Sequence, residues 1–313
     1  MSPKLLLLLA LLLLTPLAHA AGEKIAVIPK GTTHNHWKNV EAGAREAAKE
    51  LGVEVIWKGP LKEDDRAQQI ALVQQFVSSG VHAIVLAPLD ETALRGPVRA
   101  AADRKIPVVI FDSALKGELG KDFISYVATN NRRGGELGGE ELARLLNGKG
   151  KVVLLRYAEG SASTAEREAG FLDVIKKHPG IEIIVDNRYA GPTASTAQDV
   201  SMNLIDKIRE ADGIFCANES STQGMLLALR QTGLAGKKIL VGFDASPYLL
   251  QALNRGDIQA LVAQNPKRMG YESVVAAVKH LRGEKFDTEV DTGCVLVTKA
   301  NQSTPEIRAV LGK

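Results

Sequence analysis

The sequence is poor in cysteine and in aromatic residues. Its 313 residues include two cysteines, and Phe, Trp and Tyr together make up 4%. Two cysteines exclude a disulfide scaffold and a zinc site of paired Cys-x-x-Cys motifs. Cys216 lies in an apolar run, Gly213 to Ala217, that predicts a buried strand, so a role as a small buried hydrophobe is favoured over a disulfide with Cys294.

No charge of one sign dominates the chain. There are 39 Lys and Arg residues against 36 Asp and Glu, a net charge of +3. This balance disfavours a nucleic-acid partner, which would call for a strongly basic surface. With 45% hydrophobic and 24% charged residues the chain is neither disordered nor fibrous, and its length suits two ordinary domains.

Long hydrophobic runs are missing except near the start. Lys4 precedes ten apolar residues, Leu5 to Leu14, and Ala18-His19-Ala20 has the small-x-small pattern of a cleavage site. This pattern predicts a signal peptide, residues 1–20, removed after Ala20 to release the protein on the far side of the membrane without stable membrane insertion. A buried N-terminal helix is the alternative interpretation.

Catalytic and cofactor motifs are also missing. There is no GxSxG elbow and no HExxH, and the glycine-rich stretch Gly134 to Gly139 lacks the spacing and the preceding strand of a dinucleotide site. Helix packing explains those glycines better. His34 and His36 are two residues apart with no identifiable third ligand, so they predict polar groups in a cleft and no metal site. No catalytic residue and no cofactor is predicted.

What is present is an alternation of short apolar runs and longer amphipathic stretches, which predicts α/β lobes with parallel sheets. Apolar residues recur with helical spacing over 39–51, and Gly52 follows as a helix C-terminus. The predicted strands are Ile25–Pro29, Val53–Trp57, Ala83–Ala87, Val108–Phe111, Val152–Arg156, Ile181–Val185, Gly213–Ala217 and Ile239–Phe243.

The order of these elements repeats. Residues 42–56 are echoed by residues 169–184, and the stretch leading to Ile106–Asp112 is echoed by the one leading to Ile239–Asp244. The repeat predicts two similar doubly wound lobes, the second beginning near Asn130.

The repeat also places Asp112 and Asp244 at equivalent positions, each directly after a strand. Ligands of open parallel sheets bind at the carboxyl ends of the strands. Lys30 and Arg156 follow the first strand of each half, so facing lobes would enclose carboxylates and cations. Such groups suit a polyhydroxylated ligand, because a carboxylate accepts hydrogen bonds from adjacent hydroxyls. Helix capping is the alternative for each aspartate, and a solvated side chain for Lys30.

Two further residues are candidates for ligand contact. Trp37, at the start of the first helix, offers a flat apolar face for a sugar ring, and a loop-packing role is the alternative. Arg167 lies near the start of the first helix of the second half, where a surface ion pair is the alternative.

The motifs around these positions resemble the periplasmic solute-binding proteins of sugar ABC transporters, of the ribose-binding type, which are related to the effector domains of lactose-repressor-like regulators. The resemblance covers residues 24–300 and implies that Asp112, Arg167, Asn218, Asp244 and Gln264 bind a sugar. Its most specific pieces are Ile106-Pro107-Val108, Glu166-Arg167, Gly170-Phe171, Asn218-Glu219, Val241-Gly242-Phe243-Asp244 and Val262-Ala263-Gln264.

The sequence differs from the ribose-binding proteins at positions that bear on the identity of the ligand. This chain has Ser113 where they carry arginine, and His36 and Trp37 where they carry two phenylalanines. Ile28-Pro29-Lys30 and Gly59-Pro60 are similar to the branch that includes rhamnose and autoinducer receptors, in which the matching lysine touches the ligand. A receptor for a deoxysugar or an autoinducer-type ligand, which would feed a sensor, is therefore the alternative to a receptor for an ordinary monosaccharide.

The resemblance implies a type I periplasmic binding protein fold with a three-segment hinge, near Thr129, Ala263 and Asp291. The expected lobes are 21–129 plus 264–291, and 130–263 plus 292–313. The expected function is capture of a monosaccharide or polyol and its delivery to an ABC permease by a monomer. A regulator's effector domain and an exported α/β enzyme are less favoured. The expected ligand-binding residues are Lys30, His34, His36, Trp37, Asp112, Asn130, Arg167, Asn218, Asp244 and Gln264.

Overall fold

The computed structural model describes residues 22–312. The predicted signal peptide, 1–20, and the cleavage site before Ala21 lie outside the described residues. Within 22–312, none of the helices combines the length and the apolar character needed to traverse a bilayer.

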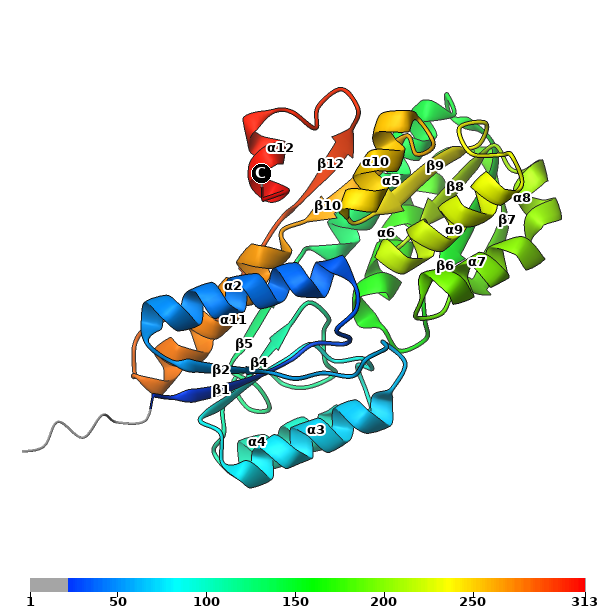
Figure 1. Ribbon diagram of the computed structural model, residues 1–313. Helices are drawn as coiled ribbons and strands as arrows, with labels where there is room; N and C mark the ends of the chain where they lie inside the picture. The colour runs from blue at the N-terminus through cyan, green and yellow to red at the C-terminus, as the bar shows by residue number, and fades with distance from the viewer. Residues whose placement is uncertain (1–21, 313) are drawn as a thin grey trace, which may run out of the picture.

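The chain forms two lobes side by side, each with a six-stranded sheet between layers of helices (Figure 1). The first lobe contains β1 (Lys24–Ile28), α2 (Asn35–Leu51), β2 (Glu54–Trp57), α3 (Arg66–Ser79), β3 (Ala83–Leu86), α4 (Arg95–Asp103), β4 (Val108–Phe111), β5 (Ser125–Ala128), α11 (Pro266–Leu281) and β11 (Glu289–Asp291). The second lobe contains α5 (Asn131–Leu145), β6 (Lys149–Arg156), α6 (Ala162–Ile175), β7 (Gly180–Tyr189), α7 (Ala194–Asn203), α8 (Ile205–Glu210), β8 (Gly213–Cys216), α9 (Glu219–Gln231), β9 (Ile239–Phe243), α10 (Pro247–Arg255), β10 (Ala260–Gln264), β12 (Cys294–Thr298) and α12 (Pro305–Val310).

The two sheets have the same strand order. It is β2-β1-β3-β4-β5-β11 in the first lobe and β7-β6-β8-β9-β10-β12 in the second. All neighbours are parallel except β12, which runs antiparallel to β10. The prediction of two similar lobes with parallel sheets is confirmed, and corresponding strands end at corresponding edges.

Helices bury both faces of each sheet, which explains why the strands are apolar along their whole length. In the first lobe α2 and α11 pack on one face and α3 and α4 on the other. In the second lobe α5 and α6 cover one face, and α7 to α10 cover the other.

The glycine-rich stretch lies on α5 and serves helix packing, as predicted. A Cβ on Gly135 would lie 1.9 Å from the backbone oxygen of Arg167 on α6, and one on Gly138 would lie 2.3 Å from the Phe215 ring. These glycines let α5 approach both α6 and the sheet.

All eight predicted strands are present, with ends shifted by up to four residues. The predicted helix over 39–51 begins earlier, at Asn35, and ends at Leu51, followed by Gly52 with a left-handed φ of 70°. Strands β5, β10, β11 and β12 were not predicted. Three of them, β5, β11 and β12, are short or only partly buried, so their apolar pattern is weak.

Both cysteines are free. Cys216 is fully buried in the second lobe's core, which confirms its predicted hydrophobic role, and burial raises the pKa of its thiol.

Three segments of the chain pass between the lobes. They lie between β5 and α5, between β10 and α11, and between β11 and β12. All three run beside one another at the centre of the molecule, between the two sheets (Figure 1).

Candidate functional site

Asp112 and Asp244 occupy equivalent positions, directly after β4 and β9. Both have a left-handed backbone, with φ of 61° and 69°. Each backbone N–H donates to the neighbouring strand, that of Asp112 to Val127 at 3.0 Å and that of Asp244 to Val262 at 2.8 Å. Left-handed φ is costly for a residue with a Cβ and is concentrated at functional sites. The same unusual turn therefore carries one carboxylate in each lobe.

Cationic side chains surround the Asp112 carboxylate. The His36 Nε2 lies 2.9 Å from its Oδ1, and the Lys30 Nζ lies 3.7 Å from its Oδ2. Burial alone would raise the pKa of Asp112, but the hydrogen bond from His36 and the charge of Lys30 lower it. Burial lowers the pKa of Lys30. Burial would also lower the pKa of His36, but the hydrogen bond and the charge of Asp112 outweigh burial, so the pKa of His36 is raised. Asp112 is thus held as a carboxylate in a buried polar cluster.

Asp244 accepts hydrogen bonds from its own lobe. Its Oδ2 accepts from the backbone N–H of Glu219 at 2.9 Å, and its Oδ1 accepts from the Gln264 Nε2 at 2.7 Å. The Gln264 Oε1 is buried and has no hydrogen-bond partner among residues 22–312. An unpaired buried acceptor is costly, so this amide oxygen is available to a ligand hydroxyl.

Arg167 is buried on α6, not in the surface ion pair that was the alternative interpretation. Its guanidinium stacks 4.0 Å from the centre of the Phe243 ring. The Nε donates to the Asn131 Oδ1 at 2.8 Å and the Nη1 donates to the backbone oxygen of Ala217 at 3.0 Å. These contacts hold a planar cation at the wall of the space between the lobes.

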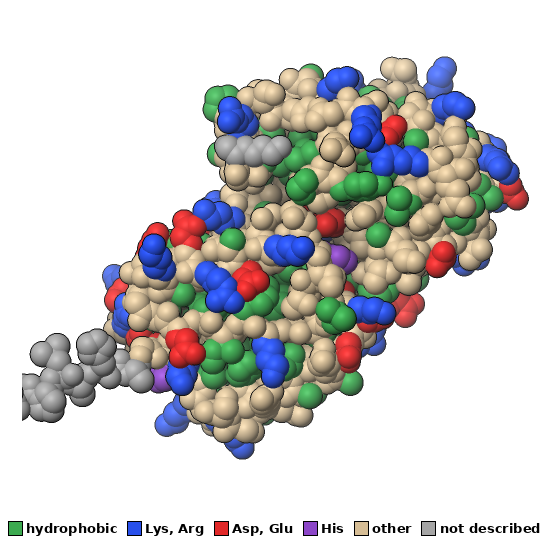
Figure 2. All heavy atoms as spheres, viewed as in Figure 1, with side chains coloured by type: hydrophobic (Ala, Val, Ile, Leu, Met, Phe, Trp, Pro, Cys, Tyr) green, Lys and Arg blue, Asp and Glu red, His purple; other side chains and the backbone are tan. Residues whose placement is uncertain are grey.

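These side chains line one small cavity between the lobes, with a volume of about 30 Å³. Figure 2 shows acidic and histidine side chains exposed in the crevice where the lobes meet. The lining residues are Lys30, His34, His36, Trp37, Glu63, Asp112, Tyr157, Ser163, Thr164, Arg167, Asn218, Glu219, Asp244 and Gln264. The structure therefore brings together nine of the ten predicted ligand-binding residues.

The exception is Asn130, which is exposed and does not line the cavity. Its side chain caps α5 by accepting from the backbone N–H of Arg133 at 3.0 Å. The next residue, Asn131, is buried and contacts Arg167. Arg156 is a second correction, since its side chain pairs with Glu168 at 2.8 Å and the following residue, Tyr157, lines the cavity instead. Neighbouring residues of an extended chain point in opposite directions, so an error of one residue exchanges the two roles.

Five lining residues were not among the predicted ligand-binding residues: Glu63, Tyr157, Ser163, Thr164 and Glu219. Glu63 lies in the loop after β2, a βα loop at the same edge as those of Lys30 and Asp112. The rule that ligands meet the carboxyl ends of strands pointed to this loop, but its acidic run resembles an ordinary solvated turn.

The lobes are in direct contact around the cavity. Lys30 Nζ donates to the hydroxyls of Ser161 and Ser163, both at 3.1 Å. The Glu219 carboxylate accepts from the backbone N–H groups of Asn35 and His36, at 3.2 and 3.0 Å. This carboxylate from one lobe thus meets the N-terminus of α2 in the other, where a negative charge is favourable.

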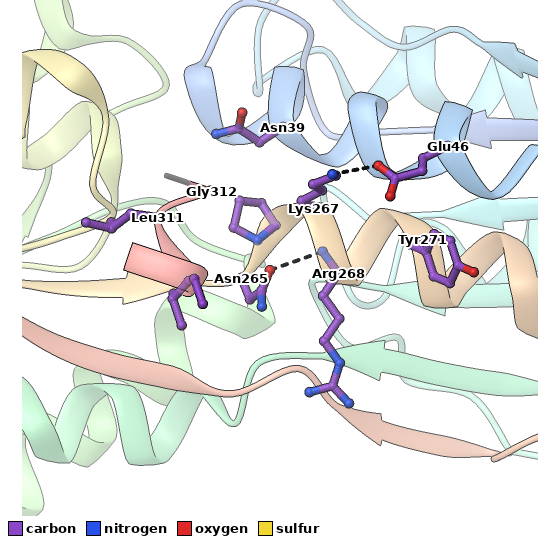
Figure 3. Close-up of a pocket in the computed structure, with 11 residues that line it drawn as sticks. Asn39, Glu46, Asn265, Lys267, Arg268, Tyr271, Leu311 and Gly312 are labelled. Carbon is purple, nitrogen blue, oxygen red and sulfur yellow. Dashed lines mark hydrogen bonds and ion pairs between the residues drawn. The ribbon is translucent and has the colours of Figure 1, made fainter. Parts of the chain in front are cut away.

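A larger groove of about 400 Å³ lies between α2, the start of α11 and the end of α12 (Figure 3). Its charged groups already have partners. The Lys267 Nζ lies 2.6 Å from Glu46, and the Asn265 side chain caps α11 by accepting from the Arg268 N–H at 3.1 Å. The groove is open to solvent and lacks the converging buried polar groups of the cavity, so it is not the candidate site.

The described part of the chain contains no cluster of three or more His, Cys, Asp or Glu side chains that is arranged to hold a metal ion. His34 and His36 instead pair with the carboxylates of Glu63 and Asp112.

The His34–Glu63 pair predicts a dependence of stability on pH. Burial opposes protonation of His34, but Glu63 at 2.6 Å, together with Glu219 and Asp244, raises its pKa from 6.5 to about 9. A raised pKa in the folded state means that the stabilisation is complete below pH 6.5 and is lost as pH rises through about 9.

We expect the free energy of unfolding of the wild type to fall by about 1–3 kcal/mol more than that of His34→Gln between pH 6 and about pH 9.5. Urea unfolding across this range measures the difference. Parallel curves for the two proteins would contradict the assigned pairing.

Two similar α/β lobes, joined by three segments and enclosing a polar cavity, define a two-lobed ligand-binding protein. The family model described as "Periplasmic binding protein domain" matches residues 25–285. The chain belongs to this family, and its fold is the type I periplasmic binding protein fold of the ribose-binding type.

Named relatives and solved structures agree with this family. The chain is 28% identical over 280 residues to "Ribose import binding protein RbsB" of Salmonella typhimurium, covering 89% of this chain and 92% of the relative. A carbohydrate transporter solute binding protein from Agrobacterium radiobacter, in complex with D-arabinose, is 36% identical with a TM-score of 0.87, covering 93% of this chain and 99% of that one. A solute binding protein from Agrobacterium vitis with bound D-fucose is 34% identical with a TM-score of 0.87, covering 91% and 98%.

Proposed function

We propose that this protein is a periplasmic solute-binding protein that captures a monosaccharide or similar polyol between its lobes and delivers it to an ABC-transporter permease. The observation that carries the proposal is the cavity, in which equivalent carboxylates from both lobes lie beside buried cations and amides. Such groups can satisfy every hydroxyl of a sugar, and hydrogen bonds to charged groups are the strong ones.

The roles of the individual residues are part of this proposal. Asp112 and Asp244 accept hydrogen bonds from sugar hydroxyls, Arg167 donates to them, and Trp37 contacts the apolar face of the ring. Lys30, His34, His36, Asn218 and Gln264 complete the shell of donors and acceptors. The three connections act as a hinge, so that the lobes separate to admit the ligand.

The relatives' names support a neutral sugar. They include proteins named for ribose and allose, and solved neighbours hold D-arabinose and D-fucose. D-fucose is a deoxysugar, so the neighbour that binds it supports the alternative of a deoxysugar ligand. None of these relatives is named as an enzyme, and we propose that this chain releases its ligand unchanged.

We further propose that residues 1–20 direct export and are removed after Ala20, and that the mature protein acts as a monomer. Proteins described as periplasmic among the relatives support the export. Membership of the same family supports the last part of the proposed function, which is docking to a permease.

A thermal-shift screen tests the function. We expect one of D-arabinose, D-fucose, D-ribose, D-allose and D-tagatose to raise the unfolding temperature by several degrees, because a ligand at 100 times its dissociation constant adds about 2.7 kcal/mol. Sucrose at the same concentration serves as a control for non-specific stabilisation. The absence of a shift with every sugar of this panel would contradict the proposal.

Trp37 gives a second test. Its side chain lines the cavity, is only 3% exposed and lies edge-on to Phe111. We expect the sugar that gives the largest thermal shift to change the intrinsic fluorescence of Trp57→Phe as it does that of the wild type. Trp37→Phe should lose this change. If the fluorescence change were lost in Trp57→Phe and kept in Trp37→Phe, Trp37 would not be a ligand-contacting residue.

A further inference from the structure

Glu63 is a buried carboxylate with three side-chain partners. Its Oε1 accepts from the Trp37 Nε1 at 2.6 Å and lies 2.6 Å from the His34 Nδ1. Its Oε2 accepts from the Tyr157 hydroxyl at 2.7 Å. Trp37 and His34 belong to the first lobe, as does Glu63, whereas Tyr157 follows β6 in the second lobe.

The local backbone makes room for this side chain. Glu63 lies in the loop between β2 and α3, and the loop ends where Asp65 caps α3 by accepting from the Gln68 N–H. A Cβ at Gly31 would lie 2.8 Å from the Glu63 Cγ, so the glycine in the loop after β1 allows the carboxylate to reach Trp37 and His34.

The three partners use most of the hydrogen-bond acceptor capacity of the Glu63 carboxylate. Three donors already share its two oxygens, and the side chain is 7% exposed. The charges of His34 and Lys30 and the hydrogen bond from Tyr157 lower the pKa of Glu63 to about 2, although burial opposes this, so it remains ionised. Glu63 therefore contrasts with Gln264, whose buried oxygen is unpaired. Its geometry suits a residue that orients other groups rather than one that binds the ligand itself.

We propose that Glu63 is a positioning residue of the ligand site: it fixes the Trp37 indole and the His34 imidazole within the first lobe, and through Tyr157 it holds the two lobes closed around the ligand. This proposal rests on the proposed function. The bonds to Trp37 and His34 lie within one lobe and persist when the lobes separate. The bond to Tyr157 crosses between the lobes and must break on opening, so it delays release of the ligand.

The chain contains a matched control for this bond. The Tyr271 hydroxyl donates to Glu50 at 2.6 Å, but this tyrosine on α11 and this glutamate on α2 belong to the same lobe. Both Tyr157→Phe and Tyr271→Phe remove one hydroxyl donor from a glutamate, and only the first removes a bond between the lobes.

The first experiment needs no ligand. Small-angle X-ray scattering of the sugar-free proteins should give a larger radius of gyration for Tyr157→Phe and for Glu63→Gln than for the wild type and Tyr271→Phe. Equal radii for all four proteins would overturn the role of Glu63 in holding the lobes together.

The second experiment uses D-arabinose and stopped-flow fluorescence in the Trp57→Phe background. We expect Tyr157→Phe to release D-arabinose about tenfold faster with an association rate within twofold of the parent. Tyr271→Phe should match the parent.

Glu63→Gln should also shift the Trp37 emission maximum without sugar, because the indole loses a charged acceptor. Equal dissociation rates in Tyr157→Phe and Tyr271→Phe, or an unchanged emission maximum in Glu63→Gln, would overturn the proposal.

Failure of the proposed function gives a different pattern. If the parent protein bound neither D-arabinose nor any sugar of the thermal-shift panel, the proposed function would fail, while the scattering and the emission of sugar-free Glu63→Gln would still decide whether Glu63 connects the lobes and holds the indole.

Discussion

Asp112→Asn is expected to weaken sugar binding by about 30- to 100-fold, or about 2–3 kcal/mol. Asparagine keeps the size of the side chain and tolerates the left-handed φ of 61° at this position. The substitution removes the charge that accepts from His36 and faces Lys30. A sugar hydroxyl at this position then meets a neutral amide beside two cations. Isothermal titration with the sugar selected by thermal shift measures the loss.

Two further variants complete this test. Asp244→Asn is expected to show a loss of similar size, because Asp244 occupies the equivalent position in the second lobe. Asp122→Asn is the control, since Asp122 is also buried in the first lobe but accepts from the Glu118 N–H and from Arg99, away from the cavity. If Asp112→Asn bound the sugar as tightly as Asp122→Asn, Asp112 would be a structural cap and not a ligand residue.

Gly170→Ala is expected to lower the free energy of unfolding by about 2–3 kcal/mol, although alanine has the higher helix propensity. A Cβ on Gly170 would lie 2.1 Å from the backbone oxygen of Arg132, so α5 and α6 would have to separate. Arg167 lies on the same helix, and its displacement would also weaken sugar binding. Urea unfolding followed by circular dichroism measures the change in stability.

Gly96→Ala is the matched control for this substitution. Gly96 lies on α4, and a Cβ there would meet no atom within 4 Å. The change should be neutral or stabilising, by up to about 1 kcal/mol. If the two variants had equal free energies of unfolding, the close approach of α5 and α6 would not be required for the stability of the fold.

The same packing explains the internal repeat. Gly43 on α2 corresponds to Gly170 in the repeated sequence, and a Cβ there would lie 1.8 Å from the backbone oxygen of Lys267 on α11. Each lobe thus uses a glycine at the same place to bring two helices together over its sheet. The repeat was visible in the sequence because both lobes need a small residue at this crossing.

The sequence by itself determined the alternation of strands and helices, the two similar lobes and the equivalence of Asp112 and Asp244. These features depend on hydrophobic periodicity and on residues close to strand ends, and such local patterns can be recognised in the amino-acid sequence alone. Nine of the ten proposed ligand residues line the cavity for the same reason, because the carboxyl ends of parallel strands must share one edge.

Only the tertiary structure decided which of two neighbouring residues faces the cavity, as with Arg156 and Tyr157 or Asn130 and Asn131. It also decided the contacts of Glu63, whose partner Tyr157 is 94 residues away in the other lobe. Sequence patterns carry no information on such pairs, because the distance between the two side chains depends on how the lobes are placed against each other. That placement results from the three connecting segments and the contacts around the cavity, none of which has a periodic signature.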